Sequence, residues 1–398
     1  MRTLMLTSTL PRFPGDMQAN FVGEQAEAWT KARSQDRVIV LAPGDPTAQP
    51  VEDRGAIRVE RFRYMRPEKL QKLAYPAILP NLRRNPGLAV QIPPFIWSQY
   101  RAAKALVKWD RIDLVYAHWV MAQGVIAWRL KRATGTPYIL QNHSSDVAVF
   151  EKLGELGKRL ARLIIREADH FFCVNSIQRE AAASLFEGSE REQFLANCTV
   201  LPMGVVLPPP NPKAKREFDV ATIGRLSAKK GIHYLIAASE RLAEEKKRPV
   251  IGIAGDGEEM ANLQALTDRA DIRFLGFVSD NEKDEFFDRT ARFAFPAKEA
   301  DGDVEGLPVS LLEALCRGMP VLASRDTNIE LLPEWNRLRE YVVFVDDPAN
   351  ELVMDVGLKR LLELPSTPND QLIEIMARYR WDRLIEDYLR PIERSVVS

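Results

Sequence analysis

The chain has 398 residues, of which 46% are hydrophobic, and its 55 lysines and arginines balance its 55 aspartates and glutamates. This composition supports a full core in two or three domains and excludes a disordered chain. The zero net charge argues against a dedicated nucleic-acid binder. There is no apolar run of about 18 residues and no signal-peptide pattern, and Cys173, Cys198 and Cys316 lie far apart in the sequence. We therefore expect a cytoplasmic protein that can still touch a membrane surface.

The first half of the chain alternates short apolar runs with amphipathic helical patterns. Helical periodicity is clear over Phe21–Ala32 and Leu153–Ala168, and the runs between such patterns have the length and composition of strands. This alternation predicts a parallel sheet with helices on both faces. The strands expected here are Thr3–Leu6, Val38–Ala42, Leu114–Tyr116, Tyr138–Leu140, Phe171–Val174 and Thr199–Leu201.

A proline-rich segment, residues 207–217, then interrupts the pattern and predicts a hinge, because clustered prolines cannot sit inside regular structure. We expect two doubly wound α/β domains, 1–206 and 218–379, with a C-terminal helix at about 380–398 packing back onto the first. Ligands of such sheets bind outside the carboxyl ends of the strands, so the cleft between the domains is the expected site. The second half is expected to contain helices at Ile232–Glu244 and Pro308–Arg317, and strands at Phe218–Ile223, Val250–Ala254, Ile272–Leu275, Phe293–Phe295, Val321–Ala323 and Val342–Val345.

The segment from Glu305 to Glu313 carries two acids on either side of an expected helix start at Pro308. Proline suits the first helical turn, and free amides at a helix start attract an anion. Glu305 is placed to meet sugar hydroxyls, whereas Glu313 lies among leucines and needs a partner if it is buried, which ribose hydroxyls would supply. The alternative is a capping acid followed by a solvated helix acid.

A second cationic element follows the strand that ends at Ile223. Arg225 and Lys230 bracket a turn between Gly224 and Gly231, and the glycines permit a close backbone approach. Two cations at such a turn suit a diphosphate, with the guanidinium able to bind two oxygens at once. The alternative is a basic surface turn.

Four motifs in order, at 224–231, 254–258, 274–278 and 305–313, resemble family 4 of the glycosyltransferases. The resemblance implies the GT-B fold, with two Rossmann-like domains facing across a central cleft, and a retaining reaction that needs no metal. It also implies contacts to each part of a nucleotide-sugar donor. Arg225 and Lys230 would hold the diphosphate, Glu313 the ribose, Glu305 with the backbone of Gly306, Leu307, Pro308 and Val309 the sugar, and the backbone of Phe277 and Val278 the base.

The first half matches the family more loosely. Gly15 lies in a loop after the first strand that resembles the family's loop near the donor phosphates, and His118 ends a strand in the position of the family's acceptor-domain histidine. His118 would then lie near the reacting centre. His143, in a His-x-x-Asp turn that ends at Asp146, is a further acceptor-side candidate. The alternative for His118 is a core or capping histidine.

Residues 61–108 are strongly basic, with Glu68 as their single acid. Cations interleaved with large apolar residues suit an anionic membrane surface, which would bring the enzyme to a lipid-linked acceptor. The alternative is a solvated insertion that packs on the domain, and nothing else in the sequence supports nucleic acid. The cations are Arg61, Arg63, Arg66, Lys69, Lys72, Arg83, Arg84, Arg101, Lys104 and Lys108, and the apolar residues are Phe62, Tyr64, Leu70, Tyr75, Ile78, Phe95, Ile96, Trp97 and Tyr100.

The expected function is retaining transfer of a sugar from a UDP- or GDP-linked donor to a glycan or lipid-linked hydroxyl, in cell-surface polysaccharide or glycolipid biosynthesis. We expect front-face attack by the acceptor hydroxyl, as the family resemblance implies, because the two glutamates would then serve different parts of the donor. Asp301 and Asp303 imitate an Asp-x-Asp metal site, but residues 296–300 separate them from the strand, so we expect no metal. The alternatives are a non-catalytic nucleotide-sugar-binding scaffold and another GT-B activity such as epimerisation. A nicotinamide oxidoreductase is disfavoured, because no Gly-x-Gly-x-x-Gly follows the first strand.

Overall fold

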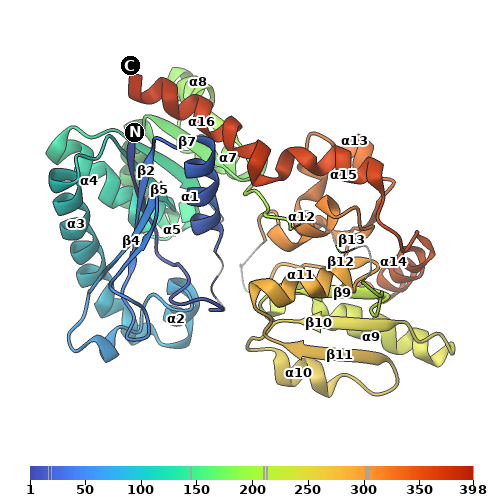
Figure 1. The fold of residues 1–398 in the computed structure, drawn as a ribbon. Coiled ribbons are helices and arrows are strands. Elements are labelled where there is room, and N and C mark those ends of the chain that lie inside the picture. The colour runs from blue at the N-terminus through green and yellow to red at the C-terminus, as the bar shows by residue number, and fades with distance from the viewer. Residues whose placement is uncertain are drawn as a thin grey trace. The chain divides into compact units, whose positions relative to one another are not determined.

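The computed structural model describes residues 1–16, 18, 20–143, 146–208, 211, 214–300 and 305–397. The chain divides into two compact units (Figure 1), a first unit of Met1–Met203 with Leu384–Ser398 and a second unit of Gly204–Arg383. The sequence places these boundaries at 206 and about 380. Within the part of the chain that is described, none of the helices has the length and apolarity needed to cross a membrane.

The first unit is built on an eight-stranded sheet of order β3-β4-β2-β1-β5-β6-β7-β8. Each strand expected from the sequence is present, with ends shifted by at most two residues. The sequence missed the edge pair β3–β4, the antiparallel part of the sheet, because β3 is mostly charged and exposed. The strands are β1 (Arg2–Leu6), β2 (Arg37–Pro43), β3 (Val51–Arg54), β4 (Ile57–Phe62), β5 (Leu114–His118), β6 (Tyr138–Asn142), β7 (His170–Cys173) and β8 (Cys198–Val200).

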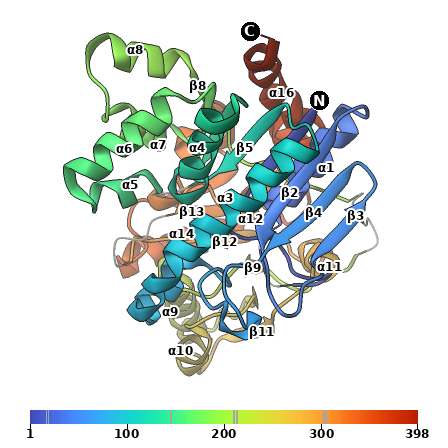
Figure 2. The same cartoon turned by 90° about the vertical axis from the view of Figure 1, so that its left-hand side faces the viewer.

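Helices cover both faces of this sheet, with α3 and α4 on one face and α1 on the other (Figures 1 and 2). Coverage on both sides explains why β5, β6 and β7 are buried along their whole length. The last helix, α16, returns to this unit, where the Tyr388 hydroxyl donates to the carbonyls of Leu201 (3.1 Å) and Pro202 (3.0 Å). The helices are α1 (Phe21–Ala32), α2 (Ile78–Arg84), α3 (Ile92–Trp109), α4 (Val125–Thr134), α5 (Asp146–Glu151), α6 (Gly154–Arg166), α7 (Ser176–Ala183), α8 (Gly188–Ala196) and α16 (Trp381–Val397).

The second unit has a six-stranded parallel sheet of order β11-β10-β9-β12-β13-β14. Leu235 of α9 and Leu358 of α14 share one buried apolar cluster, whereas Leu312 of α12 and Leu372 of α15 share another. The strands are β9 (Val220–Ile223), β10 (Val250–Ala254), β11 (Asp271–Gly276), β12 (Phe293–Phe295), β13 (Val321–Ser324) and β14 (Val342–Val345). The helices are α9 (Ile232–Glu244), α10 (Met260–Ala265), α11 (Asp280–Asp288), α12 (Val309–Cys316), α13 (Trp335–Leu338), α14 (Glu351–Glu363) and α15 (Asp370–Met376).

Each sheet has a point where the strand order reverses. In the first unit the chain moves outward from β1 in one direction and from β5 in the other, and in the second unit β9 and β12 play the same part. Ligands of doubly wound sheets bind outside the carboxyl ends of the strands at this switch point. The chain after Leu6, His118, Ile223 and Phe295 is therefore where a site is expected on physical grounds.

The cysteines need one correction. Cys173 and Cys198 are far apart in the sequence, but β7 and β8 are neighbours, and the two Sγ atoms lie 3.7 Å apart. The two residues are not joined by a disulfide. Spacing along the chain gave no sign of this pair, because it depends on the strand order.

Candidate functional site

At the carboxyl end of the second sheet, the loops after β9 and β10 are in direct backbone contact. The Gly224 amide donates to the Ala254 carbonyl (3.1 Å), and the Leu226 amide donates to the Asp256 carbonyl (2.9 Å). A Cβ atom on Gly255 would lie 1.9 Å from the Gly224 carbonyl oxygen, so a larger residue cannot be accommodated there. The close contact between these two loops therefore requires glycine at position 255.

Lys230 lies at the switch point of this sheet. It ends a 3-10 turn, and the following Gly231 has a left-handed backbone with φ +66°. A Cβ atom on Gly231 would lie 1.8 Å from the Pro296 carbonyl oxygen, so the turn packs directly on the loop after β12. The Lys230 ammonium lies 4.7 Å from the ring centroid of Phe295, the last residue of β12. The ammonium is thus held where β9 and β12 diverge.

Glu305 points at this cation. Its Oε1 atom lies 2.9 Å from Nζ of Lys230 and 3.4 Å from Nζ of Lys229, and its side chain is 10% exposed. Burial alone would raise the pKa of the Glu305 carboxyl, but the two ammonium groups outweigh burial and lower that pKa below its usual range. Glu305 is therefore a carboxylate, and the sequence gave no indication that it pairs with Lys230.

The start of α12 corrects one expectation. Pro308 was expected in the first helical turn, but its backbone is extended (φ −64°, ψ 126°), and the helix begins at Val309. Pro308 is instead the N-cap residue, and its carbonyl accepts from the amides of Leu311 and Leu312, both at 3.2 Å. Gly318, with φ +75°, follows the helix in the left-handed conformation expected of a glycine at that place.

Glu313 is buried inside α12, with 4% of its surface exposed, so the alternative of a solvated helix acid is wrong. The partner that burial demands is present, since Nζ of Lys283 on α11 donates to Oε1 of Glu313 at 2.7 Å. The sequence missed Lys283, because nothing in local spacing connects two helices separated by a strand.

Arg225 and Phe277 lie at the same end of the sheet. The Arg225 guanidinium is 42% exposed and donates from Nε to Oε2 of Glu258 at 3.1 Å. Phe277 is 39% exposed and Val278 is half-buried, directly after β11. The Gly255 amide donates to the Gly276 carbonyl (2.7 Å), which fixes the start of this turn. The roles of these residues toward a ligand remain predictions.

In the first unit, His118 is the last residue of β5, and His143 directly follows the neighbouring strand β6. His118 is fully buried, its Nδ1 shares a hydrogen bond with Nε2 of His143 (2.9 Å), and the two rings are stacked. Burial lowers the pKa of His118 to about 3. Burial, and then the charge of His118, lower the pKa of His143 well below its usual range. Both imidazoles are therefore neutral at physiological pH.

His118 keeps one polar atom unused. Its Nε2 is buried and has no hydrogen-bond partner among the described residues. Phe21 and Trp119 each place a ring centroid 4.8 Å from that of His143, so aromatic rings surround the pair. Trp119 follows β5 with a left-handed backbone (φ +74°), which is uncommon for a tryptophan. Buried side-chain nitrogens usually have a hydrogen-bond partner, so Nε2 of His118 is a candidate ligand contact.

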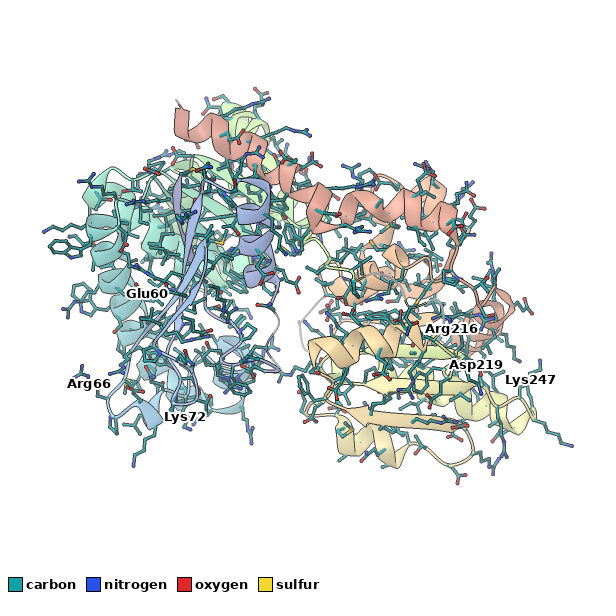
Figure 3. The ribbon with its side chains drawn as sticks, viewed as in Figure 1. Glu60, Arg66, Lys72, Arg216, Asp219 and Lys247 are labelled. Carbon is teal, nitrogen blue, oxygen red and sulfur yellow. The ribbon has the colours of Figure 1, made fainter. Side chains whose placement is uncertain are left out.

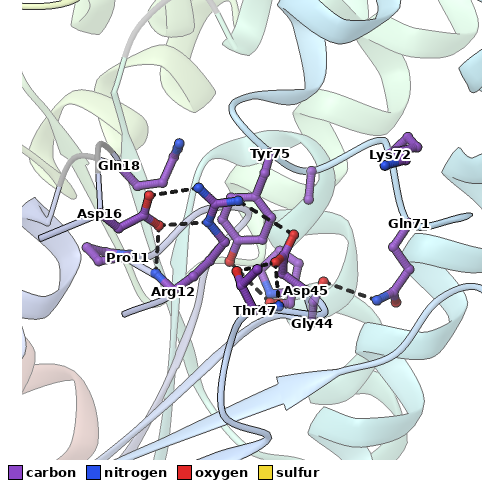
Figure 4. Close-up of polar contacts among 12 residues, drawn as sticks. Pro11, Arg12, Asp16, Gln18, Gly44, Asp45, Thr47, Gln71, Lys72 and Tyr75 are labelled. Carbon is purple, nitrogen blue, oxygen red and sulfur yellow. Dashed lines mark hydrogen bonds and ion pairs between the residues drawn. The ribbon is translucent and has the colours of Figure 1, made fainter. Parts of the chain in front are cut away.

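The loop that carries Gly15 is held at both ends (Figure 4). The Arg12 backbone and guanidinium both donate to the Asp16 carboxylate, at 2.8 Å. Arg61 on β4 donates to the Pro11 carbonyl at 2.5 Å. Gly15 lies inside this bracket with φ +79°, a conformation that favours glycine. The loop follows β1, so it lies at the same switch point as His118.

The basic stretch 61–108 divides into two parts. In the first, Arg61 is 8% exposed and pairs with Glu52, Arg63 pairs with Glu68 at 2.7 Å, and Tyr64 belongs to the core. The alternative of an insertion packed on the domain therefore holds for these residues. Arg66 and Lys72 nevertheless remain exposed at this end of the unit (Figure 3).

The second part of the stretch is helix α3, whose sequence contains no acid. Its inner face buries Phe95 and Gln99, whereas Trp97 is 58% exposed and shares the outer face with Arg101, Lys104 and Lys108. Within the described part of the chain, none of these cations pairs with a carboxylate. We call the surface formed by Trp97, Arg101, Lys104 and Lys108 the α3 face.

A cavity of about 800 Å³ in the second unit lies elsewhere, at the amino-terminal end of β9, and is lined in part by Arg216 and Arg289. Arg216 uses its guanidinium to close the end of α11, donating to the carbonyls of Asp288 and Thr290 at 2.6 Å. This cavity is at the opposite end of the sheet from Lys230 and is not the expected donor site.

Asp301 and Asp303, the imitation of a metal motif, lie outside the described residues. Within the ranges that are described, His, Cys, Asp and Glu side chains form no group of three or more that could hold a metal ion.

Two family models match the chain, one in each half. The model of glycosyl transferases group 1 covers residues 207–370, and the model of the glycosyl transferase 4-like domain covers residues 18–198. The chain belongs to the family 4-like glycosyltransferases. The GT-B fold is supported by the solved structure of sucrose-phosphate synthase from Thermosynechococcus elongatus, which aligns with 99% of this chain and 98% of its own at a TM-score of 0.70 and 17% identity.

Two curated relatives differ in how much of the chain they match. The putative colanic acid biosynthesis glycosyltransferase WcaL of Escherichia coli (strain K12) is 29% identical over 48% of this chain and 47% of its own, so the match spans about half of that relative. The putative teichuronic acid biosynthesis glycosyltransferase TuaC of Bacillus subtilis (strain 168) is 25% identical over 81% of each chain.

Proposed function

We propose that this glycosyltransferase moves a hexosyl group from a nucleoside-diphosphate sugar to a hydroxyl of a glycan or lipid-linked acceptor, with retention and without a metal. The observation that carries the proposal is the buried Glu305 carboxylate, held 2.9 Å from Lys230 at the switch point of the second sheet. A carboxylate and an ammonium at one point match a donor whose sugar and diphosphate adjoin.

Arg225, Lys230 and the start of α12 at Val309 are assigned to the diphosphate. The donor diphosphate carries more charge than one carboxylate and would compete with Glu305 for Lys230. Once displaced, the carboxylate can accept hydrogen bonds from sugar hydroxyls. The cations stabilise the charge that develops on the leaving nucleoside diphosphate, which is the part a divalent metal plays in other enzymes.

Glu313 is assigned to the ribose, and the backbone of Phe277 and Val278 to the base of a UDP- or GDP-linked donor. The Lys283 ammonium donates to Oε1 of the buried Glu313, and the second oxygen of this side chain can accept from a ribose hydroxyl. Backbone groups do not reveal through side-chain identity whether the base is uracil or guanine, so a panel of donors must distinguish the two.

His118 is assigned to the reacting centre and His143 to the acceptor side. A neutral imidazole offers its unpartnered Nε2 as a donor or acceptor to a hydroxyl, without placing a positive charge beside the sugar. Glu305 and Glu313 pair with different lysines, Lys230 and Lys283, which fits separate roles for the two acids better than the nucleophile and acid/base couple of retaining glycosidases. This arrangement supports front-face attack by the acceptor hydroxyl.

The acceptor class rests on two supports. The names of WcaL and TuaC place those proteins in the biosynthesis of colanic and teichuronic acids, which supports a role in cell-surface polysaccharide or glycolipid biosynthesis. The α3 face supports contact with an anionic membrane surface, because its cations pair with no carboxylate of the described residues and its Trp97 is exposed. Such contact would bring the enzyme to a lipid-linked acceptor.

A donor panel tests the proposal. Purified protein is incubated with UDP- and GDP-sugars, with and without EDTA, and released nucleotide is measured together with the anomeric configuration of any product by NMR. We expect release from one donor class, unchanged by EDTA, and a product of retained configuration. Complete loss in EDTA or an inverted product would overturn the mechanism. Donor binding without transfer or hydrolysis would favour the non-catalytic scaffold, and a changed sugar in the recovered donor would favour an epimerase.

A further inference from the structure

Asn328 joins the loop after β13 to the backbone that carries Glu305. Its Nδ2 donates to the Gly306 carbonyl at 2.8 Å and to the Glu305 carbonyl at 3.2 Å. The residue lies between two short 3-10 turns, 325–327 and 329–331, and its own backbone is left-handed, with φ +57°. That conformation aims the side chain across the sheet edge toward residues 305 and 306.

The same sheet edge contains further backbone ties. Oδ2 of Asp326 accepts from the Glu299 amide at 2.6 Å, and the Lys298 amide donates to the Lys229 carbonyl at 2.9 Å. The loops after β9, β12 and β13 are therefore joined in sequence. Of these contacts, the hydrogen bonds of Asn328 are the ones made to Glu305 and Gly306, which precede α12.

We propose that Asn328 is a positioning residue, which fixes the Glu305–Gly306 backbone so that the carboxylate stays beside Lys230. The inference rests on the proposed role of Glu305. Asparagine suits the place for two reasons, because it tolerates the left-handed conformation and because its amide can donate to two carbonyls. Glycine would keep the conformation and lose the donor, whereas aspartate would keep the shape and present oxygen to the carbonyls.

These differences give a sharp test with Asn328→Gly and Asn328→Asp. If Asn328 positions Glu305, both variants should lower kcat for the donor by about tenfold or more, with Asn328→Asp the worse, while KM changes less. If only the left-handed backbone matters, both variants should retain wild-type kcat, and the proposal is overturned. Lys246→Gly is the matched control, since Lys246 is an exposed left-handed residue (φ +62°) elsewhere in the same unit.

A second readout separates this inference from the proposed function. Hydrogen–deuterium exchange over residues 305–312 should rise in Asn328→Gly and stay unchanged in Lys246→Gly, whatever the protein's activity. Unchanged exchange and unchanged kcat would overturn the positioning role. If exchange increases in Asn328→Gly but turnover does not depend on Glu305, the positioning role of Asn328 is supported and the proposed function is overturned. In an active protein, the effects of Asn328→Gly and Glu305→Gln on kcat should be less than additive.

Discussion

The carboxylate of Glu305 and the ammonium of Lys230 meet at 2.9 Å, although 75 positions separate the two residues in the sequence. The meeting is a consequence of topology, because Lys230 follows β9 and Glu305 follows β12, and these strands are neighbours at the switch point. Under the proposed function, a donor enters a place where opposite charges already compensate each other. This relationship sets the first two predictions.

Glu305→Gln should lower donor turnover by about a hundredfold or more, because it removes the charge that orients the sugar and keeps the size of the side chain. Nucleotide release and product formation are measured at saturating donor. The control is Glu334→Gln in the same unit, since the Glu334 side chain is also 10% exposed but pairs with Arg378. Equal losses in the two variants, or full activity in Glu305→Gln, would contradict the assignment.

The lowered pKa of Glu305 predicts how its contribution to stability depends on pH. A carboxyl whose folded-state pKa lies below its unfolded value stabilises the fold above the unfolded pKa, about 4.3 for glutamate, and loses that effect as pH falls through the folded pKa. In urea unfolding, wild type should be more stable than Glu305→Gln at pH 7, and the gap should close below about pH 4.

The background variant Lys229→Met/Lys230→Met provides the control for this pH dependence. Without the two ammonium groups, burial remains and the cause of the lowered pKa is gone. The additional effect of Glu305→Gln should then be absent or reversed at pH 7. A gap between wild type and Glu305→Gln that is constant from pH 7 to pH 3 would show that the cations do not hold the carboxylate charged.

The architecture was largely readable from the sequence, for a physical reason. Strands buried on both faces, such as β10 and β12, are continuous apolar runs, and the helices between them show their own period. The sequence did not predict the edge strand β3, because its residues are mostly charged and exposed. Such a strand has no pattern of apolar residues by which it could be recognised. Pro308 was placed one position too far into α12, because proline is equally compatible with an extended N-cap.

The sequence predicted which residues belong to the candidate site but not which of them pair with one another. Lys230 and Glu305 were each identified, but their ion pair was not, and neither Lys283 nor Asn328 was recognised at all. Local sequence reports the period, caps and turns of one element. The partner of a buried carboxylate is chosen by which loops meet at a sheet edge, and that depends on strand order.

The histidine pair predicts an unusual acid sensitivity. Because burial lowers the pKa of His118 to about 3, against about 6.5 in the unfolded chain, the unfolded state binds more protons as pH falls below 6.5. The free energy of unfolding should therefore fall between pH 6.5 and 4, by up to about 3 kcal/mol from this residue. His118→Asn, which cannot be protonated, should show a shallower decline in urea titrations at fixed pH values.

The same pKa shift predicts the form of the activity profile. Since His118 stays neutral, donor turnover should show no protonation step of this imidazole between pH 5 and 8, while His118→Asn should still reduce turnover through loss of the buried Nε2. An NMR titration in which the His118 ring signals move with a midpoint near 6.5 would contradict the neutral pair.

The last prediction concerns the α3 face. Charge reversal by Arg101→Glu/Lys104→Glu/Lys108→Glu should abolish flotation of the protein with vesicles that contain anionic phospholipid, since each cation near such a surface contributes about 1 kcal/mol. Wild-type binding should fall as salt is raised and should be absent with vesicles of phosphatidylcholine alone. The control is Lys246→Glu/Lys247→Glu/Arg360→Glu, which makes the same change of charge at exposed positions of the second unit.

A separate substitution distinguishes attraction by charge from insertion of the indole. Trp97 is 58% exposed on the same face, and its ring centroid lies 6.0 Å from that of Tyr100. If the aromatic side chain enters the interface, Trp97→Ala should weaken flotation at high salt as well as at low salt, because apolar burial is not screened by ions. If both the charge-reversal variant and Trp97→Ala float as well as the wild type, the membrane contact does not involve α3. If the wild type does not float with the vesicles, the outer face of α3 is a solvent-exposed surface. Residues 61–108 are then an insertion packed on the first unit, as the buried Arg61 and Tyr64 already indicate for its first part.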